Sequence, residues 1–273
     1  MTRGFLLFAH NNEQVNYGLL ALWQARRIKT HLNSAVSIVT DPDTAYALDG
    51  IDLNWRNSFD QVIFSNADTT QTKRYIDRSL TFRNVDRIAA WDLTPYDETI
   101  VMDTDIVIQG PTLNKLWGHA QDLLVCRRST DLMGVTAEEF QRISDKSLPF
   151  VWATVVYFKK TDHARVFFEQ CKLVKSQYNW YRYVYQLNTG PMRNDFVWSI
   201  ALHTLGGTAS GSWAQSIPWN LHHSNNEDRL LKMTQDAVRI LTDQGLVLIK
   251  HQDVHIFNKL NLIEHIKQEM GIL

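Results

Sequence analysis

Residues 100–108 read Ile100-Val101-Met102-Asp103-Thr104-Asp105-Ile106-Val107-Ile108, an apolar run interrupted by two carboxylates. A short apolar run rich in β-branched residues predicts a buried strand. Because side chains alternate between the two faces of an extended chain, Asp103 and Asp105 are expected to project to the same side. Two ionised carboxylates on one side repel each other unless a cation lies between or beside them. The segment therefore predicts a core strand whose two carboxylates need a cation or another stabilising partner.

The oxygen atoms of a carboxylate pair are suitable ligands for Mg²⁺ or Mn²⁺, and these ions bridge the phosphates of bound nucleotides. A metal-binding pair is therefore one interpretation of the pattern. A second interpretation is that one aspartate caps a helix while the other is solvated at the end of a strand. The pattern is short and common, so by itself it favours neither interpretation.

Strand and helix patterns alternate on both sides of this segment. Buried strands are expected at residues 4–10, 34–40, 61–65, 151–158 and 246–250, and helices at residues 15–31 and 162–177. The sequence Asp41-Pro42-Asp43 predicts a turn after the second of these strands. Apolar strands without strict alternation predict an α/β fold, with a mostly parallel central sheet and helices on both faces. Ligands of such sheets bind outside the carboxyl ends of the strands, where Asp103 and Asp105 are expected to lie.

Composition and charge limit the classes of function. The chain has 273 residues, 28 Lys plus Arg and 29 Asp plus Glu, so no overall charge attracts it to nucleic acid or to an anionic membrane, although a local basic groove remains possible. Cys126 and Cys171 lie far apart, which argues against a disulfide framework or a thiolate zinc site. No segment approaches the roughly 20 apolar residues of a spanning helix. We therefore expect a cytoplasmic protein without a membrane partner.

The sequence before the aspartate pair matches a known pattern. It reads Arg87-Ile-Ala-Ala-Trp91-Asp-Leu-Thr-Pro-Tyr96-Asp-Glu-Thr-Ile-Val-Met102. A basic residue, a helix with an aromatic, a turn with a tyrosine and an apolar strand before Asp-x-Asp resemble the glycogenin-like glycosyltransferases of the GT-A fold. The resemblance implies a Rossmann-like, nucleotide-diphospho-sugar transferase sheet. It also implies that Arg87 contacts the phosphates of the donor.

Two further segments are similar to the same family. The opening sequence FAHNNEQVNYGLLAL resembles the first strand of the family and the residues after it, which implies that Asn11 and Tyr17 contact the base or ribose. Asp41, at the end of the second strand, is similarly placed. The segment from Arg193 to Trp198 resembles the one that carries an acidic residue beside the sugar. The resemblance therefore implies a catalytic role for Asp195.

The C-terminal region resembles a shortened form of the family motif in which a histidine completes the metal shell and a lysine binds phosphates. Here the sequence reads His255-Ile-Phe-Asn258-Lys259, which implies His255 as a third metal ligand and Asn258 and Lys259 as donor contacts. The family's Gly and Pro-Trp are missing and the spacing is shorter, so His251 competes with His255. An imidazole beside two carboxylates favours Mn²⁺ over Mg²⁺.

A second departure concerns the sugar and acceptor site. Where the family has Asn-x-Gly, this chain has Trp152-Ala153-Thr154, so the sugar and acceptor stay open. The resemblance implies one GT-A domain over residues 1–273, with a nucleotide-sugar half at 1–110 and an acceptor half at 111–273. It implies transfer from a nucleotide-diphosphate sugar, foremost a UDP-sugar, to an acceptor hydroxyl with retention. Asp103, Asp105 and Asp195 are the expected catalytic residues.

Other functions remain open at this point. The acceptor can be a glycan, a small molecule or a hydroxymethylated base in DNA, and the aromatic segment 178–185 with Arg182 and Arg193 keeps the DNA acceptor open. A non-catalytic nucleotide-binding scaffold is the alternative of another class. A nucleotidyltransferase is a third possibility, but its usual Gly-rich phosphate loop is missing at residues 10–13.

Overall fold

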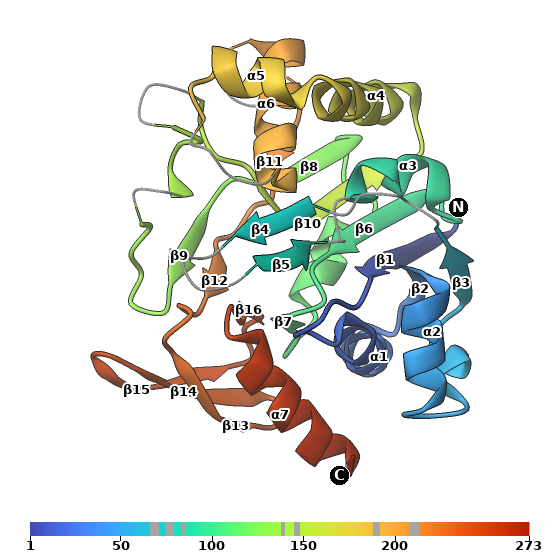
Figure 1. The fold of residues 1–273 in the computed structure, drawn as a ribbon, viewed down its shortest axis with the longest axis vertical. Helices are drawn as coiled ribbons and strands as arrows, with labels where there is room; N and C mark the ends of the chain where they lie inside the picture. The colour runs from blue at the N-terminus through green and yellow to red at the C-terminus, as the bar shows by residue number, and fades with distance from the viewer. Residues whose placement is uncertain are drawn as a thin grey trace.

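The computed structural model describes residues 1–65, 71–74, 79–82, 86–137, 140–144, 148–187, 192–207 and 213–272, with the backbone alone for 71–74, 79–82 and 86 (Figure 1). A seven-stranded sheet in the order β11-β8-β10-β6-β1-β2-β3 forms its centre. Four of its neighbouring pairs are parallel, and only β10 runs antiparallel to both neighbours. The strands are β1 Arg3–Ala9, β2 Ala35–Thr40, β3 Gln61–Phe64, β6 Glu98–Met102, β8 Leu123–Cys126, β10 Trp152–Lys159 and β11 Gln215–Ser216. The predicted α/β fold with a mostly parallel sheet is confirmed.

Helices cover the sheet. Helix α1 (Tyr17–Arg27) packs against β1 and β2. Helix α6 (Asn194–Gly206) packs against β10 and is itself covered by α4 (Asp162–Ser176). Within the described ranges, no helix is long and apolar enough to cross a membrane. The α-helices are α1 Tyr17–Arg27, α2 Pro42–Asp49, α3 Ala90–Leu93, α4 Asp162–Ser176, α5 Tyr178–Val184, α6 Asn194–Gly206 and α7 Lys259–Met270. Shorter helical segments are the π-helical η1 Ile28–Leu32 and the 3-10 turns η2 Trp55–Ser58, η3 Asp86–Ala89 and η4 Thr112–Leu116.

The central strands are fixed by burial on both sides. In β1 every residue from Gly4 to Ala9 is buried, and β6 is buried throughout, which explains why neither shows polar alternation. Gly4 is required for packing, since a Cβ there would lie 2.3 Å from the ring of Tyr96. The side chain of Asn16 caps α1 by accepting a hydrogen bond from Leu19 N at 2.8 Å. These contacts stabilise β1 and α1, which lie within one to four residues of the strand and helix predicted at 4–10 and 15–31.

Three smaller sheets complete the fold. One has the order β7-β16-β12-β9, a second is the antiparallel meander β13-β14-β15, and the third is the pair β4-β5. The meander packs on α1 and α7 around a second, smaller core. The strands are β4 Gln71–Arg74, β5 Ser79–Phe82, β7 Ile106–Val107, β9 Ser129–Asp131, β12 Leu221–His223, β13 Arg229–Met233, β14 Ala237–Thr242, β15 Gly245–Lys250 and β16 Val254–His255.

Three local predictions were wrong. Residues 100–108 are not one strand, because β6 ends at Met102 and the chain turns through Asp103 and Asp105 into β7 of a different sheet. The Asp41-Pro42-Asp43 sequence does not form a reverse turn; Asp41 is the N-cap of α2, and proline suits the first turn of a helix because it needs no hydrogen-bond donor there. The strand predicted at 246–250 forms as β15, but it is not buried, because alternate residues of this meander strand are exposed.

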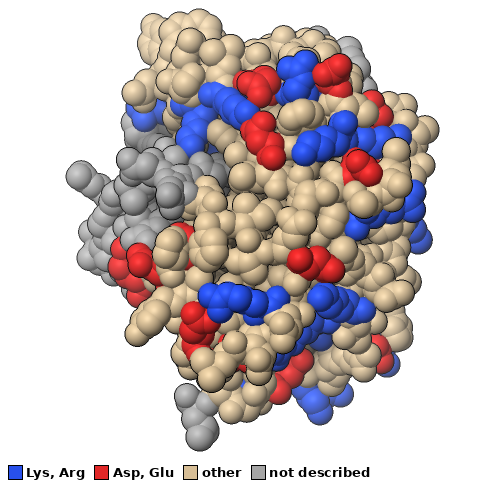
Figure 2. Space-filling model, turned by 90° about the vertical axis from the view of Figure 1, so that its right-hand side faces the viewer, with Lys and Arg blue, Asp and Glu red and all other residues tan. Residues whose placement is uncertain are grey.

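Charges on the face shown in Figure 2 are mixed in sign, with Lys and Arg next to Asp and Glu. Exposed ion pairs of the described surface include Arg26 with Asp52 at 2.7 Å and Lys29 with Asp60 at 3.7 Å. Exposed pairs of this kind contribute at most about 1 kcal/mol each to stability. This face therefore carries no field of one sign.

Candidate metal centre

The turn that carries Asp103 and Asp105 connects two sheets. Asp103 N donates a hydrogen bond to Thr154 O at 2.9 Å, and Ile256 N donates to Asp105 O at 2.9 Å. The main chain of the turn is thus held by the start of β10 on one side and by the segment after β16 on the other. The Asp105 side chain is 2% exposed, whereas that of Asp103 is 18% exposed. Asp105 is therefore the buried member of the pair, and Asp103 faces solvent.

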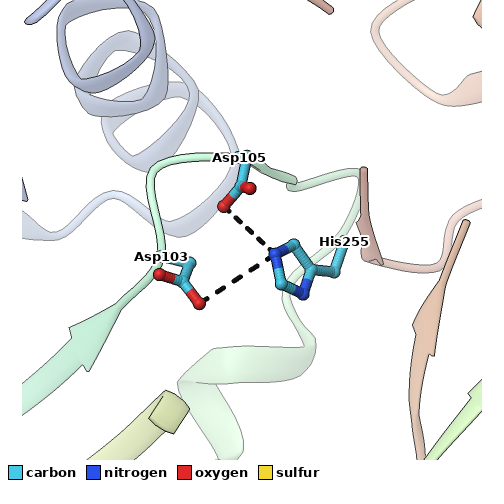
Figure 3. A group of neighbouring side chains, drawn as sticks. All are labelled: Asp103, Asp105 and His255. Atoms are coloured by element: carbon cyan, nitrogen blue, oxygen red, sulfur yellow. Dashed lines mark ion pairs between the residues drawn. The ribbon is translucent and has the colours of Figure 1, made fainter. Parts of the chain in front are cut away.

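His255 reaches the two carboxylates through strand pairing. Strand β16 pairs with β7 so that His255 lies opposite Ile106, next to the turn. Its Nε2 lies 3.2 Å from Asp105 Oδ1 and 3.9 Å from Asp103 Oδ2, as Figure 3 shows. The ring packs edge-on against Phe257 with centroids 4.9 Å apart, which restricts its orientation. The pairing of β16 with β7 thus brings His255 next to the turn with Asp103 and Asp105, although they lie far apart in the sequence.

The donor atoms fit a divalent metal ion. One ligand atom from each of Asp103, Asp105 and His255 can be chosen so that all three lie within 4.8 Å of one another. Two carboxylate oxygens and a neutral imidazole form a donor set that first-row divalent metals such as Mn²⁺ accept. The Nε2 atom of His255 faces the carboxylates. The Nδ1 atom is buried and has no hydrogen-bond partner among the described residues.

Two cations balance the aspartates. Arg87, on η3, forms an ion pair with Asp103 and also donates to Ala153 O at 3.0 Å. Lys259, the first residue of α7, forms an ion pair with Asp105. Burial alone would raise the pKa of Asp105, but His255 and Lys259 hold it far below its ordinary value. The Asp105 carboxylate is therefore ionised at neutral pH.

The same contacts keep the cations charged. Burial alone would lower the pKa of Lys259, yet the neighbouring Asp105 raises it above its ordinary value. The pKa of Arg87 is likewise raised by Asp103, against the opposing effect of burial. Tyr17 lies beside this group: burial raises the pKa of its hydroxyl, and Lys259 acts in the opposite direction. Six predicted residues thus form one electrostatic cluster: Tyr17, Arg87, Asp103, Asp105, His255 and Lys259.

Asp195 lies in the first turn of α6 and contacts the start of β10. Its Oδ1 accepts a hydrogen bond from Ala153 N at 2.8 Å, and its Oδ2 accepts bonds from Arg193 at 2.8 and 3.0 Å. Arg87 and Asp195 therefore bind the carbonyl and the amide of the same residue, Ala153. This backbone connection was not predicted, because it involves only main-chain groups of Ala153.

Three other predicted donor contacts lie at chain turns and helix starts. Asn11 Oδ1 accepts from Gly18 N at 2.9 Å, and Asp41 Oδ1 accepts from Thr44 N at 2.7 Å as the N-cap of α2. Asn11 and Asp41 follow β1 and β2, so both lie at the carboxyl edge of the sheet as expected. Asn258 is the N-cap of α7 and accepts from Asn261 N at 3.2 Å. Each side chain has a structural task, and the predicted contacts with a nucleotide stay predictions.

The geometry distinguishes the two candidate histidines. His251 lies in the turn after β15, with a positive φ of 55° and an exposed side chain, and it is not part of the carboxylate cluster. His223 lies nearer, stacked on Phe257 with centroids 4.9 Å apart and bonded to Ser129 Oγ at 2.8 Å. Burial, assisted by His255, lowers the pKa of His223 to about 4, so its ring is neutral. Among the residues that the structure describes, His255 is the histidine that joins the two carboxylates in a group able to hold a metal ion.

The fold is similar to solved glycosyltransferase structures. The galactosyltransferase LgtC, in complex with donor and acceptor sugar analogues, has a TM-score of 0.50 and 12% identity over 78% of this chain and 72% of LgtC. GlyE of Streptococcus pneumoniae TIGR4 gives 0.47 and 10% over 80% of this chain, which spans only 46% of GlyE. Mouse xyloside xylosyltransferase 1 gives 0.44 and 11%, covering 77% and 86% of the two chains.

No protein-family model matches the chain, and no curated protein matches its sequence. The similarity to LgtC nevertheless shows that the chain has the GT-A fold, as the sequence predicted.

Proposed function

We propose that this protein is a metal-dependent glycosyltransferase that moves a sugar from a nucleotide-diphosphate sugar to an acceptor hydroxyl. The observation that carries the proposal is the meeting of Asp103, Asp105 and His255 where a central strand ends, with two cations beside them. Such a group lies where ligands bind to sheets of this kind. The GT-A fold supports the same activity.

A divalent ion, Mn²⁺ in preference to Mg²⁺, would be held by Asp103, Asp105 and His255. When bound, it would neutralise negative charge on the departing diphosphate. With the ion balancing the carboxylates, Arg87 and Lys259 become available for the donor phosphates. Preorganised cations that meet charge on the leaving group supply most of the catalysis, so no strong general base is needed.

The sugar would be oriented by Asp195, which is held by Ala153 N and Arg193. We propose UDP as the nucleotide, with Asn11, Tyr17, Asp41 and Asn258 near the base, ribose or phosphates, and transfer with retention at the anomeric carbon. In this reaction the donor phosphate itself can accept the proton of the acceptor hydroxyl. An inverting enzyme would need a carboxylate placed as base against that hydroxyl.

The acceptor would bind in the half formed by residues 111–273, and the donor in the half formed by residues 1–110. A glycan or a small molecule is the acceptor we propose, in the cytoplasm. A hydroxymethylated DNA base is the alternative, because α5 presents Trp180 and Tyr183, which are 57% and 84% exposed, next to Arg182. Flat aromatic faces next to cations suit unpaired bases as well as sugars.

Thermal-shift screening with UDP-, GDP-, CMP- and dTDP-sugars, with and without Mn²⁺, tests the proposal. One donor should raise the melting temperature only when the metal is present, because a ligand that binds the folded state stabilises it. The shift should vanish in Asp105→Ala and persist in Asp52→Ala, which breaks a surface ion pair with Arg26. Melting in EDTA checks that each variant folds.

Release of the free nucleotide in the presence of acceptor mixtures then separates catalysis from binding. A metal-dependent shift without any release would favour the non-catalytic scaffold. No shift with any donor would contradict the proposed function.

A further inference from the structure

The meander β13-β14-β15 has one packed face and one bare face. Its inner face contributes four residues to the core formed with α1 and α7. The pairing of Leu241 with Leu246 and of Arg239 with Leu248 places these side chains on the outer face, where all four are exposed. Leu231, in the bulge of β13, is exposed as well. The exposed fractions are 43% for Leu231, 40% for Leu241, 60% for Leu246 and 47% for Leu248.

Cations surround these leucines. Arg229 lies opposite Leu241, and Lys232 lies directly opposite Arg239, so Arg229 and Lys232 are on the outer face as well. Lys250 lies at the end of this face, opposite Ala237. No ion pair of these four cations with an acidic residue occurs in the described part of the chain. The surface in Figure 2 is different, because there opposite charges adjoin.

This arrangement costs stability. Like charges directly opposite each other on neighbouring strands are destabilising, so the Lys232 and Arg239 pair opposes folding. Exposed leucines on neighbouring strands also leave apolar surface in water. Both costs are relieved if the face meets a surface that is negatively charged and apolar at once.

We propose that the outer face of the meander docks on the surface of a lipid bilayer that contains anionic lipids. Leucines would enter the boundary between headgroups and acyl chains, and the four cations would lie at the level of the phosphates. The face has no exposed aromatic side chain with which to stack on nucleic-acid bases. The face also lacks the tryptophan, tyrosine and phenylalanine side chains that are enriched in protein interfaces.

This docking departs from the expectation of no membrane partner, which rested on the lack of a spanning segment. A protein that lies on a bilayer needs no spanning helix. The inference is independent of the proposed transfer reaction, because none of these residues belongs to the metal cluster.

Vesicle co-sedimentation of the full chain tests the docking. Binding should be strong to phosphatidylcholine vesicles with about a third phosphatidylglycerol, weak to phosphatidylcholine alone, and weaker at high salt because of screening. Neutralising two cations in Lys232→Gln/Arg239→Gln should lower the partition coefficient about thirtyfold. Leu246→Ser/Leu248→Ser should lower it at least about tenfold, since buried leucines contribute strongly to insertion.

Arg26→Gln/Lys29→Gln is the matched control, since it removes two surface cations that have acidic partners, and it should bind as the wild type does. All altered residues are exposed, and melting curves verify folding. Equal sedimentation with neutral and anionic vesicles, or wild-type binding by both meander variants, would overturn the proposal. So would a wild-type dimer that Leu246→Ser/Leu248→Ser turns into a monomer, because the face would then belong to a second copy.

Discussion

Replacement of Lys259 by methionine tests whether this lysine and a metal ion neutralise the same carboxylate. Lys259 forms an ion pair with Asp105, whose side chain is only 2% exposed. Methionine keeps an unbranched apolar stem like that of lysine, ends one atom earlier and carries no charge. In the variant, His255 remains as the cationic or hydrogen-bonding neighbour of Asp105, with its Nε2 3.2 Å away.

The expected loss of stability follows from this geometry. Removal of one partner from a buried ion pair costs about 3–5 kcal/mol, because the other charge stays buried. Since the Lys259 side chain is 28% exposed and His255 remains, we expect the lower end of this range, about 3 kcal/mol. For a domain of this size, that corresponds to a fall in melting temperature of about 6–12 °C.

Mn²⁺ should reverse much of this loss. Without donor, the ion replaces the missing positive charge beside Asp105, and it no longer competes with the ammonium group. Differential scanning fluorimetry in EDTA and in Mn²⁺ should therefore show a larger metal-induced rise for Lys259→Met than for the wild type. Lys29→Met, which breaks an exposed pair with Asp60, should change stability by less than about 1 kcal/mol. The reasoning is refuted if Lys259→Met is as stable as the wild type in EDTA, or if Mn²⁺ stabilises both equally.

Two further predictions concern Glu98 and Asp195. Burial alone would raise the pKa of Glu98, but hydrogen bonds from Gly118 N, Tyr157 and Arg3 hold it below the ordinary value of 4.5. The stability from these bonds is present above that value and is lost as the pH falls through the folded pKa. In melting experiments, the free energy of unfolding of the wild type should therefore exceed that of Glu98→Gln by about 1–3 kcal/mol at pH 7 and by much less near pH 3. An equal difference at both pH values would contradict this. Asp195→Asn should lower the transfer rate about a hundredfold but keep the metal-dependent rise in melting temperature that the donor causes. An equal loss of ligand binding and of turnover would show that Asp195 acts on binding instead.

Much of the central fold could be predicted because its strands are buried on both faces. Continuous apolar runs gave β1, β2 and β10, and the helix pattern at 15–31 agrees with α1 and its π-helical continuation. The turn at Asp103 was less accessible to sequence reasoning. Apolar residues flank it on both sides because β6 and β7 are both buried, and no local feature reveals that they belong to different sheets.

The metal cluster, too, could be predicted only in part from the sequence. The aspartate pair was evident from two charges in an apolar run, whereas His255 rested on a resemblance, because its contact with Asp105 arises from the pairing of β16 with β7. The link through Ala153 could not be predicted, since main-chain groups carry no sequence signature. The outer face of the meander also escaped notice: Leu246 and Leu248 read as core residues, and only the packing of α1 and α7 shows which face is covered.

Titration of Mn²⁺ into the protein with UDP present, followed by isothermal calorimetry or by the electron paramagnetic resonance of free Mn²⁺, tests the metal centre most directly. The wild type and His251→Ala should each bind one ion. His255→Ala should bind at least about tenfold more weakly, because it loses a ligand that no other described side chain replaces. Unchanged affinity in His255→Ala, or a loss confined to His251→Ala, would show that the ion is not held by Asp103, Asp105 and His255.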